Sequence, residues 1–158
     1  TDADGLLEAA CAEVPARAGE FSPQELSNIT YALALLGSCR IAVLRTACLG
    51  ALDQLPHFTP QGCSNLLYSL ALLRFRQPRL LRAVCAHSAQ RLHEFKEQEL
   101  ANTVYAVALL RHRDCRFLRA VCAHVPCRMD EFKTRGLSSL FYAFRLLDFR
   151  DDSYLEAA

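Results

Sequence analysis

The heptapeptide LRAVCAH occurs twice, at residues 81–87 and 118–124, and each copy places a Cys two residues before a His. Thiolate and imidazole groups are common zinc ligands, so the pair Cys85/His87 and its second copy are the first candidates for chemistry. Two residues on a helix correspond to about 200° of rotation, which points the two side chains to opposite faces. One metal ion cannot bind both, and a site joining the cysteines of the two copies would need outside ligands. We therefore expect these cysteines to pack in a core, and we expect no metal and no cofactor.

A search for catalytic residues finds no arrangement that would support a reaction. The sequence lacks a glycine-rich phosphate loop, a Gly-x-Ser-x-Gly motif and a pair of carboxylates at an informative spacing. The triplet His-Arg-Asp at 112–114 matches three letters of a kinase catalytic loop, but the accompanying Asn and Asp-Phe-Gly motif are absent. We therefore expect a protein without enzymatic activity.

The two heptapeptides belong to a repeat of 37 residues. Aromatic residues recur at this step as Phe21, Phe58, Phe95 and Phe132, and as Tyr31, Tyr68, Tyr105 and Tyr142. Another column holds Cys11, Cys48, Cys85 and Cys122, whereas Cys39, Cys63, Cys115 and Cys127 lie outside it and are expected to be incidental. Free Cys behaves as a small apolar residue, so the cysteine column predicts core packing. A period of roughly 20–50 residues held by several columns is typical of a solenoid.

Each unit is expected to contain two helices. The first helix of the first two complete units begins after Ser22 or Thr59, each followed by a proline at the first helical position. Glu25 completes a capping box with Ser22, and Gly37 suits the end of that helix. The spacing of three and four residues predicts a buried face made of Leu26, Ile29, Leu33 and Leu36. The second helix of each unit carries the cysteine column.

The predicted fold is therefore all-α, a right-handed α-solenoid of about four stacked helical hairpins with a 37-residue period. We expect a single repeat domain over residues 1–158. Its units are expected at about residues 1–20 (partial), 21–57, 58–94, 95–131 and 132–158 (partial). Both ends are expected to meet further chain or a partner, because a stacked unit buries its apolar faces against neighbours.

Composition narrows the class further. With 52% hydrophobic and 22% charged residues, the chain is not expected to be disordered. No apolar run reaches the length of about 18 residues that a membrane span needs, so no membrane insertion is expected. Eight cysteines in a chain with a sizeable core fit a reducing compartment.

Positive charge concentrates in the middle of the chain, although the net charge is only +1. Residues 74–134 hold twelve Lys and Arg against six Asp and Glu, whereas residues 1–73 hold three against seven. Eight of these arginines, here called the arginine cluster, fall between two helices or at the start of the second: Arg74, Arg76, Arg79, Arg82, Arg111, Arg113, Arg116 and Arg119. The planar guanidinium suits phosphate, so the cluster predicts contacts with a nucleic-acid backbone. The alternative is an ordinary solvated surface.

Polar residues also recur on one face of the first helix in each unit. Six of them, here called the amide stripe, are Gln24, Asn28, Gln61, Asn65, Gln98 and Asn102, with the tyrosine column beside them. In the fourth unit Arg135 and Ser139 take the amide positions. Amides can bond base edges and tyrosines can stack on bases. The alternative interpretation, in which Asn and Tyr bridge adjacent helices, is favoured, and any sequence reading would fall to variable neighbours such as Ser27 and Thr30.

Three stretches carry a resemblance to a known family: FSPQELSNITYALALLG (21–37), FTPQGCSNLLYSLALLRF (58–75) and FKEQELANTVYAVALLRH (95–112). They resemble the octotricopeptide and heptatricopeptide repeats of organellar RNA-binding proteins, and the 37-residue period matches the heptatricopeptide form. The fourth unit departs from the pattern at Arg135, Ser139 and Arg145. The RAP domain that many relatives carry is not seen in this sequence.

The resemblance implies an α-solenoid that binds RNA in an organelle, a mitochondrion rather than a chloroplast. We expect a non-enzymatic protein that holds RNA, including ribosomal RNA, within a mitochondrial ribosome or an RNA-processing complex, beside neighbouring proteins. The arginine cluster and the amide stripe are its expected RNA-binding residues. The main alternative is a protein–protein scaffold subunit of an organellar complex. A third, a fragment of an RNA-processing enzyme, would need a catalytic domain that this sequence lacks.

Overall fold

The computed structural model describes residues 2–150. Residues 151–158, the end of the partial unit predicted at 132–158, lie outside the described residues. The described part contains helices and no strand, which confirms the all-α class. Eight α-helices are present there: α1 (Asp2–Ala16), α2 (Pro23–Leu35), α3 (Ile41–Asp53), α4 (Pro60–Leu72), α5 (Pro78–Ala89), α6 (Glu97–Leu109), α7 (Cys115–His124) and α8 (Thr134–Leu146). Four short 3₁₀ turns precede the even-numbered helices: η1 (Ala18–Glu20), η2 (Leu55–His57), η3 (Leu92–Glu94) and η4 (Val125–Glu131).

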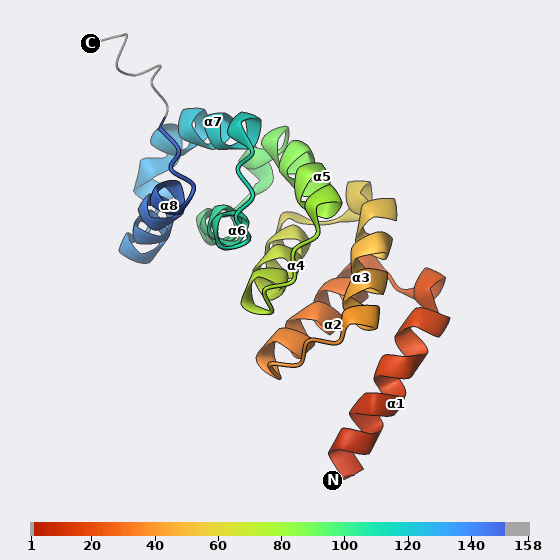
Figure 1. Ribbon diagram of the computed structural model, residues 1–158. Coiled ribbons are helices and arrows are strands. Elements are labelled where there is room, and N and C mark those ends of the chain that lie inside the picture. The colour runs from red at the N-terminus through yellow and green to blue at the C-terminus, as the bar shows by residue number, and fades with distance from the viewer. Residues whose placement is uncertain (1, 151–158) are drawn as a thin grey trace, which may run out of the picture.

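The helices form two curved layers. The inner layer contains α2, α4, α6 and α8, each packed against the next, and the outer layer contains α1, α3, α5 and α7 in the same manner. Figure 1 shows the even-numbered helices along the inside of the arc and α3, α5 and α7 along its outside. No helix of the described chain combines the length and apolar character needed to cross a membrane.

Local sequence explains where the inner helices begin. The Ser22 hydroxyl accepts a hydrogen bond from the Glu25 N–H and Glu25 bonds back to the Ser22 N–H, so the predicted capping box is confirmed. The Thr59 hydroxyl accepts from the Gly62 N–H in the same way.

All four inner helices end in the same turn. The residue after each C-cap has a left-handed backbone, with φ of 61° at Gly37, 54° at Arg74, 56° at Arg111 and 47° at Asp148. At the first of these ends the Gly37 N–H bonds the Ala34 carbonyl and the Ser38 N–H bonds the Leu33 carbonyl, and the other three ends repeat the pattern. This is the Schellman arrangement, which satisfies carbonyls that the helix leaves open. Gly37 is the one residue of the four that adopts this backbone without steric cost.

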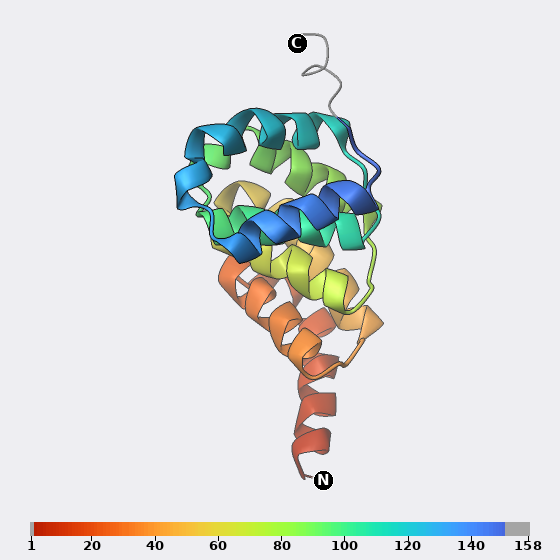
Figure 2. The same cartoon turned by 90° about the vertical axis from the view of Figure 1, so that its left-hand side faces the viewer.

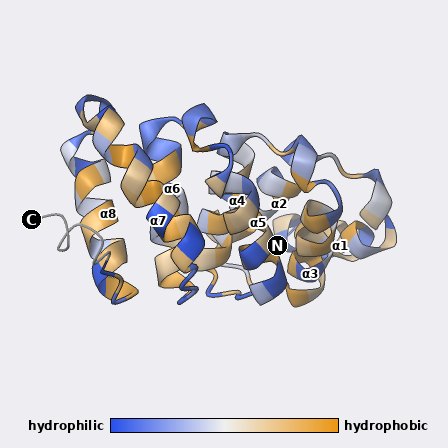
Figure 3. Cartoon of the chain, turned by 90° about the horizontal axis from the view of Figure 1, so that it is seen from above, coloured by the Kyte–Doolittle hydropathy of each residue, from blue (hydrophilic) through white to orange (hydrophobic). Residues whose placement is uncertain are grey.

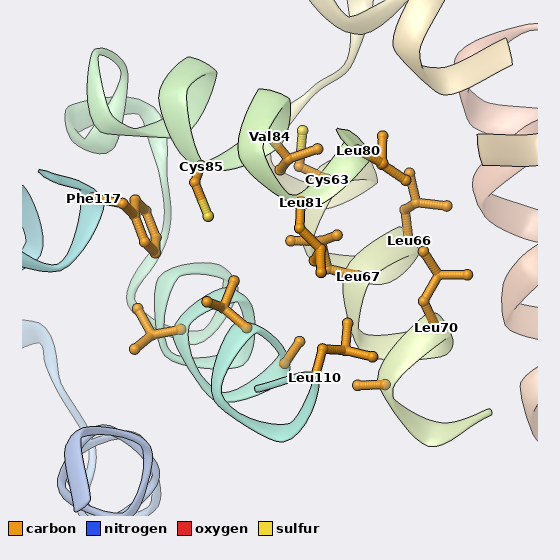
Figure 4. Packing of buried hydrophobic residues seen from close by; sticks show 14 of the residues in the cluster. Cys63, Leu66, Leu67, Leu70, Leu80, Leu81, Val84, Cys85, Leu110 and Phe117 are labelled. Carbon is orange, nitrogen blue, oxygen red and sulfur yellow. The ribbon is translucent and has the colours of Figure 1, made fainter. Parts of the chain in front are cut away.

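The core lies between the two layers. Leu44, Leu81 and Leu118 occupy equivalent positions of the outer helices and are completely buried. In Figure 4 the leucines of α4 and α5 point toward one another, and Cys85 points from α5 into the space beside Phe117. Figure 3 shows the chain from above, coloured by hydropathy, and apolar residues lie along its helices. Burial of this kind stabilises the chain in proportion to the apolar area removed from water.

Two sequence expectations about the core need correction. Leu36 was expected on a buried face but is 61% exposed. The reason is that no inner helix precedes α2 in the described chain, whereas α6 and α8, which carry the equivalent and buried Leu110 and Leu147, each pack on a preceding inner helix. Cys63 is not incidental, because it lies buried in α4 and burial raises the pKa of its thiol to about 11.

Candidate nucleic-acid interface

The histidines of the two heptapeptides do not lie beside their own cysteines. Cys85 is completely buried, whereas His87 lies half-buried on the other side of α5 and contacts Arg91, with 2.7 Å between Arg91 Nη1 and His87 Nε2. Arg91 in turn pairs with Glu94 at 2.6 Å. The second copy repeats the arrangement with His124, Arg128 and Glu131. Arginine can only donate, so the histidine Nε2 must accept and each ring is neutral.

These Arg–Glu pairs lie at one edge of the molecule, where outer helices connect to inner helices. A third pair, Arg17–Glu20, occupies the same repeat position at the first connection. Arg128 Nη1 also donates to the Leu92 carbonyl of the preceding unit, at 3.3 Å. The three arginines of this edge are therefore paired with carboxylates of their own turn, and Arg128 also bonds the preceding unit.

The arginine cluster lies at the opposite edge, where inner helices connect to outer helices. Figure 2 shows this edge at the right, where α8 ends, and the 3₁₀ connections at the left. All eight side chains are exposed. Within residues 2–150, none of the eight forms an ion pair with a carboxylate. The three arginines at the first edge are thus paired and the eight of the arginine cluster are not, although Arg40, at the α2–α3 connection of the second edge, lies 4.0 Å from Glu8.

One member of the cluster has a structural partner. Arg76 Nε donates a hydrogen bond of 2.9 Å to the carbonyl of Leu110, the C-cap of α6. Arg113, 37 residues later, makes no equivalent bond within the described chain. Two others, Arg74 and Arg111, hold the left-handed backbone described above.

The field of this edge acts on a nearby histidine. Burial is the largest cause that lowers the pKa of His112, and the positive charges of Arg76 and Arg82 lower it further, while Asp114 opposes them. The Asp114 carboxylate does not pair with an arginine. Its Oδ1 accepts the Phe117 N–H at 3.0 Å and caps α7.

The amide stripe lines grooves between neighbouring inner helices. Gln24 and Asn28 of α2 face Gln61 and Asn65 of α4 across one groove of about 500 Å³. Gln98 and Asn102 of α6 line a second groove of about 380 Å³ toward α8. The structure therefore brings the stripe to the inner face, although its members come from three different units.

The helix-bridging interpretation of Asn and Tyr is not supported by hydrogen bonds. Within residues 2–150, the side chains of Asn28, Asn65 and Asn102 form none with protein. The bridge between α2 and α4 comes instead from Ser27, whose hydroxyl donates to the Gly62 carbonyl at 3.2 Å. Among the tyrosines, Tyr105 and Tyr142 contact each other with ring centroids 5.9 Å apart.

The variable neighbours of the first three complete units are buried, whereas Ser138 and Phe141 of the fourth are exposed. Ser27, Ser64 and Ala101 are buried, as are Thr30, Leu67 and Val104. The Thr30 hydroxyl donates to carbonyls of its own helix. Ser27 and Ala101 also line the grooves, but as buried residues at their walls.

Three basic residues line the grooves but were not among the RNA-binding residues predicted from the sequence. His57 lines the groove between α2 and α4, and Lys133 and Arg135 line the groove between α6 and α8. Arg135 also lies beside Tyr105 and Tyr142 in an adjoining hollow. Only Arg135 gave a signal in the sequence, because it replaces the Gln of the amide positions, whereas His57 stands in a column otherwise held by Glu and Lys133 in the N-cap column.

The two predicted surfaces do not merge. The amide stripe starts at the first turn of each inner helix, and the arginine cluster begins just after the last turn. A helix of 13 residues is about 20 Å long, so the far ends of the two surfaces are separated by about that distance.

The chain was compared with known proteins. No family model and no curated protein matches it.

Proposed function

We propose that this chain is a segment of a right-handed α-solenoid, built from about four hairpins with a 37-residue period, that binds RNA without acting as an enzyme. The family proposed is that of the octotricopeptide and heptatricopeptide repeat proteins. The proposed setting is an organelle, a mitochondrion in particular, with ribosomal RNA of a ribosome or an RNA-processing complex as the ligand. The single observation that carries the proposal is that the eight arginines of the arginine cluster have no carboxylate partner, whereas Arg17, Arg91 and Arg128 at the opposite edge do.

Unpaired arginines favour an anionic partner. An arginine that already bonds a carboxylate has little to gain from phosphate, and that describes Arg17, Arg91 and Arg128. The arginine cluster has no such competitor among the described carboxylates, and its members recur in two adjacent units. Repeated positive charge along a surface matches the repeated negative charge of a nucleic-acid backbone.

The groove between α6 and α8 supports contacts with bases. It combines the amide of Asn102, the ring of Tyr68 and the cation of Arg135. Aromatic rings stack on unpaired bases, and amides and guanidinium groups bond base edges. RNA in a single-stranded form therefore fits this surface better than a duplex.

A protein–protein scaffold is the second candidate, and one observation favours it. An apolar hollow of about 430 Å³ lies between α7 and α8, lined by Val121, Cys122, Val125, Pro126, Met129, Leu137, Leu140, Phe141 and Phe144. Phe141 in this hollow is 77% exposed. Such a surface suits an apolar helix or peptide, and its binding would respond little to salt.

The proposal is tested with fluorescence anisotropy of a labelled single-stranded RNA added to the purified 158-residue chain. The test variant changes Arg79 and Arg116 to Ala, the residue that stands at the equivalent position 42. The matched control changes Arg91 and Arg128 to Gln, the residue at the equivalent position 54, and removes the same charge. We expect the test variant to weaken binding at least tenfold and the control to change it little. Equal losses, or no RNA binding by the folded chain, would refute the proposal.

A further inference from the structure

Cys85 does meet a histidine, but one from the next unit. The Cys85 thiol, the His112 ring and the Asp114 carboxylate place one ligand atom each within 4.8 Å of one another. They come from α5, from the turn after α6 and from the N-cap of α7. These three elements are separate in sequence, which is why the spacing of Cys85 and His87 gave no indication of the cluster.

His112 provides a second observation that points to a ligand. Its side chain is 9% exposed, and its Nε2 is buried without a hydrogen-bond partner in the described chain. A buried polar atom without a partner destabilises a fold by roughly 1–3 kcal/mol, and a bound ion is one of the groups that can satisfy it. Neither the thiol nor the carboxylate satisfies it, since no hydrogen bond joins the three groups.

The cluster is specific to one interface of the stack. At the preceding interface the equivalent positions hold Cys48, Phe75 and Gln77, which leave one metal ligand. At position 149, the next in the His112 column, stands Phe149, which is buried. A phenylalanine therefore fills this position well, and the histidine adds polarity that packing does not need.

We propose that Cys85, His112 and Asp114 bind one zinc ion. Thiolate, imidazole and carboxylate are each zinc ligands, in tetrahedral geometry with bonds of about 2.0–2.3 Å. Those bonds place neighbouring ligand atoms roughly 3.3–3.7 Å apart, so atoms at the full 4.8 Å would have to close by about 1.1–1.5 Å. Three protein ligands leave a fourth position for water.

The charges of the three ligands balance a divalent cation, against the positive charges of Arg76 and Arg82 that also lower the pKa of His112. Binding releases the Cys85 proton to solvent, and the resulting thiolate and the Asp114 carboxylate together balance the two charges of zinc. Asp114 can serve two elements at once, because Oδ1 caps α7 and the second oxygen has no recorded partner. The bound ion would tie the outer helices α5 and α7 to the turn after α6, and this role is independent of RNA binding.

The test measures metal binding by the purified 158-residue chain after dialysis against a chelator. We expect one zinc per chain and, with cobalt as the probe, the visible absorption of a tetrahedral site together with a thiolate charge-transfer band. His112→Phe copies the residues at 75 and 149 and should fold, as circular dichroism would verify. It should weaken zinc binding at least 100-fold, and Cys85→Ser should also abolish the thiolate band.

Cys48→Ser is the matched control, because Cys48 is equally buried at the equivalent position of α3. It should keep wild-type zinc affinity and the full cobalt spectrum. The proposal is overturned if the folded chain binds no stoichiometric zinc, if His112→Phe retains wild-type affinity, or if Cys48→Ser loses as much affinity as Cys85→Ser. The last result would mean that zinc binding depends on the cysteine thiols of the chain in general and not on Cys85 in particular.

Discussion

Arg76 Nε donates a hydrogen bond of 2.9 Å to the carbonyl of Leu110, 34 residues further along the chain. The bond joins the turn after α4 to the end of α6, so this arginine belongs to the stack as well as to the exposed edge. A member of the arginine cluster can therefore change RNA binding simply by changing stability. For this reason Arg76 is unsuitable as a probe of phosphate contact.

The first prediction concerns this bond. Arg76→Ala should lower the free energy of unfolding by about 1 kcal/mol, the usual contribution of one such hydrogen bond. Arg79→Ala is the control, because Arg79 is exposed and makes no bond to a described residue, and it should change stability by less than about 0.5 kcal/mol. Urea denaturation followed by circular dichroism measures both. Equal effects would contradict a structural role for Arg76.

The second prediction concerns the left-handed turns. Arg74 and Arg111 have φ of 54° and 56°, where a side chain costs about 1 kcal/mol relative to glycine. Arg74→Gly should therefore raise the unfolding free energy by about 1 kcal/mol while weakening RNA binding. Arg113→Gly removes the same charge at a position without positive φ and should give no gain. A loss of stability in Arg74→Gly would show that the side chain contributes more than its backbone strain costs.

The all-α class and the helix starts could be predicted from sequence, because helix propensity and caps depend on local chemistry. Ser22 with Glu25 and Thr59 with the proline after it are sufficient to define two helix starts. The ends were harder to predict. Gly37 indicated one, but Arg74 and Arg111 adopt the same turn without a glycine, since the preceding helix and the next unit hold them there.

The third prediction concerns pH. Burial first, and then the charge of Arg91, lowers the pKa of His87, while Glu94 partly opposes this. Below about pH 6.5 the unfolded chain takes up a proton that native His87 resists, so this histidine should make stability fall with falling pH. Arg91→Gln should raise the pKa of His87, as an NMR titration would show. An unchanged or lower value would contradict the assignment of Arg91 as a cause.

The fourth prediction separates structural from binding roles of the amide stripe. Asn102 lines the groove between α6 and α8 and makes no recorded side-chain hydrogen bond within residues 2–150. Asn102→Ala should therefore change unfolding free energy by less than about 0.5 kcal/mol, yet weaken RNA binding. Ser27→Ala is the comparison, because it removes the bond to Gly62 and should cost about 1 kcal/mol. A large loss of stability in Asn102→Ala would restore the helix-bridging interpretation.

The positions of the candidate site residues could be predicted from the sequence, but their partners could not. Sequence analysis located the arginine cluster in the turns and helix starts where the structure has it. It could not tell that Arg91 and Arg128 carry carboxylate partners while Arg79 and Arg116 do not. It separated Cys85 from His87 but could not bring Cys85 together with His112, because that contact is made across a helix interface. Such contacts depend on the packing of whole units, which periodicity alone does not define.

The most direct test of the proposed function is the salt dependence of RNA affinity for the wild-type chain and for the variant with Arg79, Arg82, Arg116 and Arg119 changed to Ala. Each phosphate contact contributes about −0.7 to the slope of log K against log salt for a single strand. We expect a steep wild-type slope that becomes shallower by about 0.7 for every arginine that contacts phosphate. An identical slope in the two proteins would contradict binding through the arginine cluster.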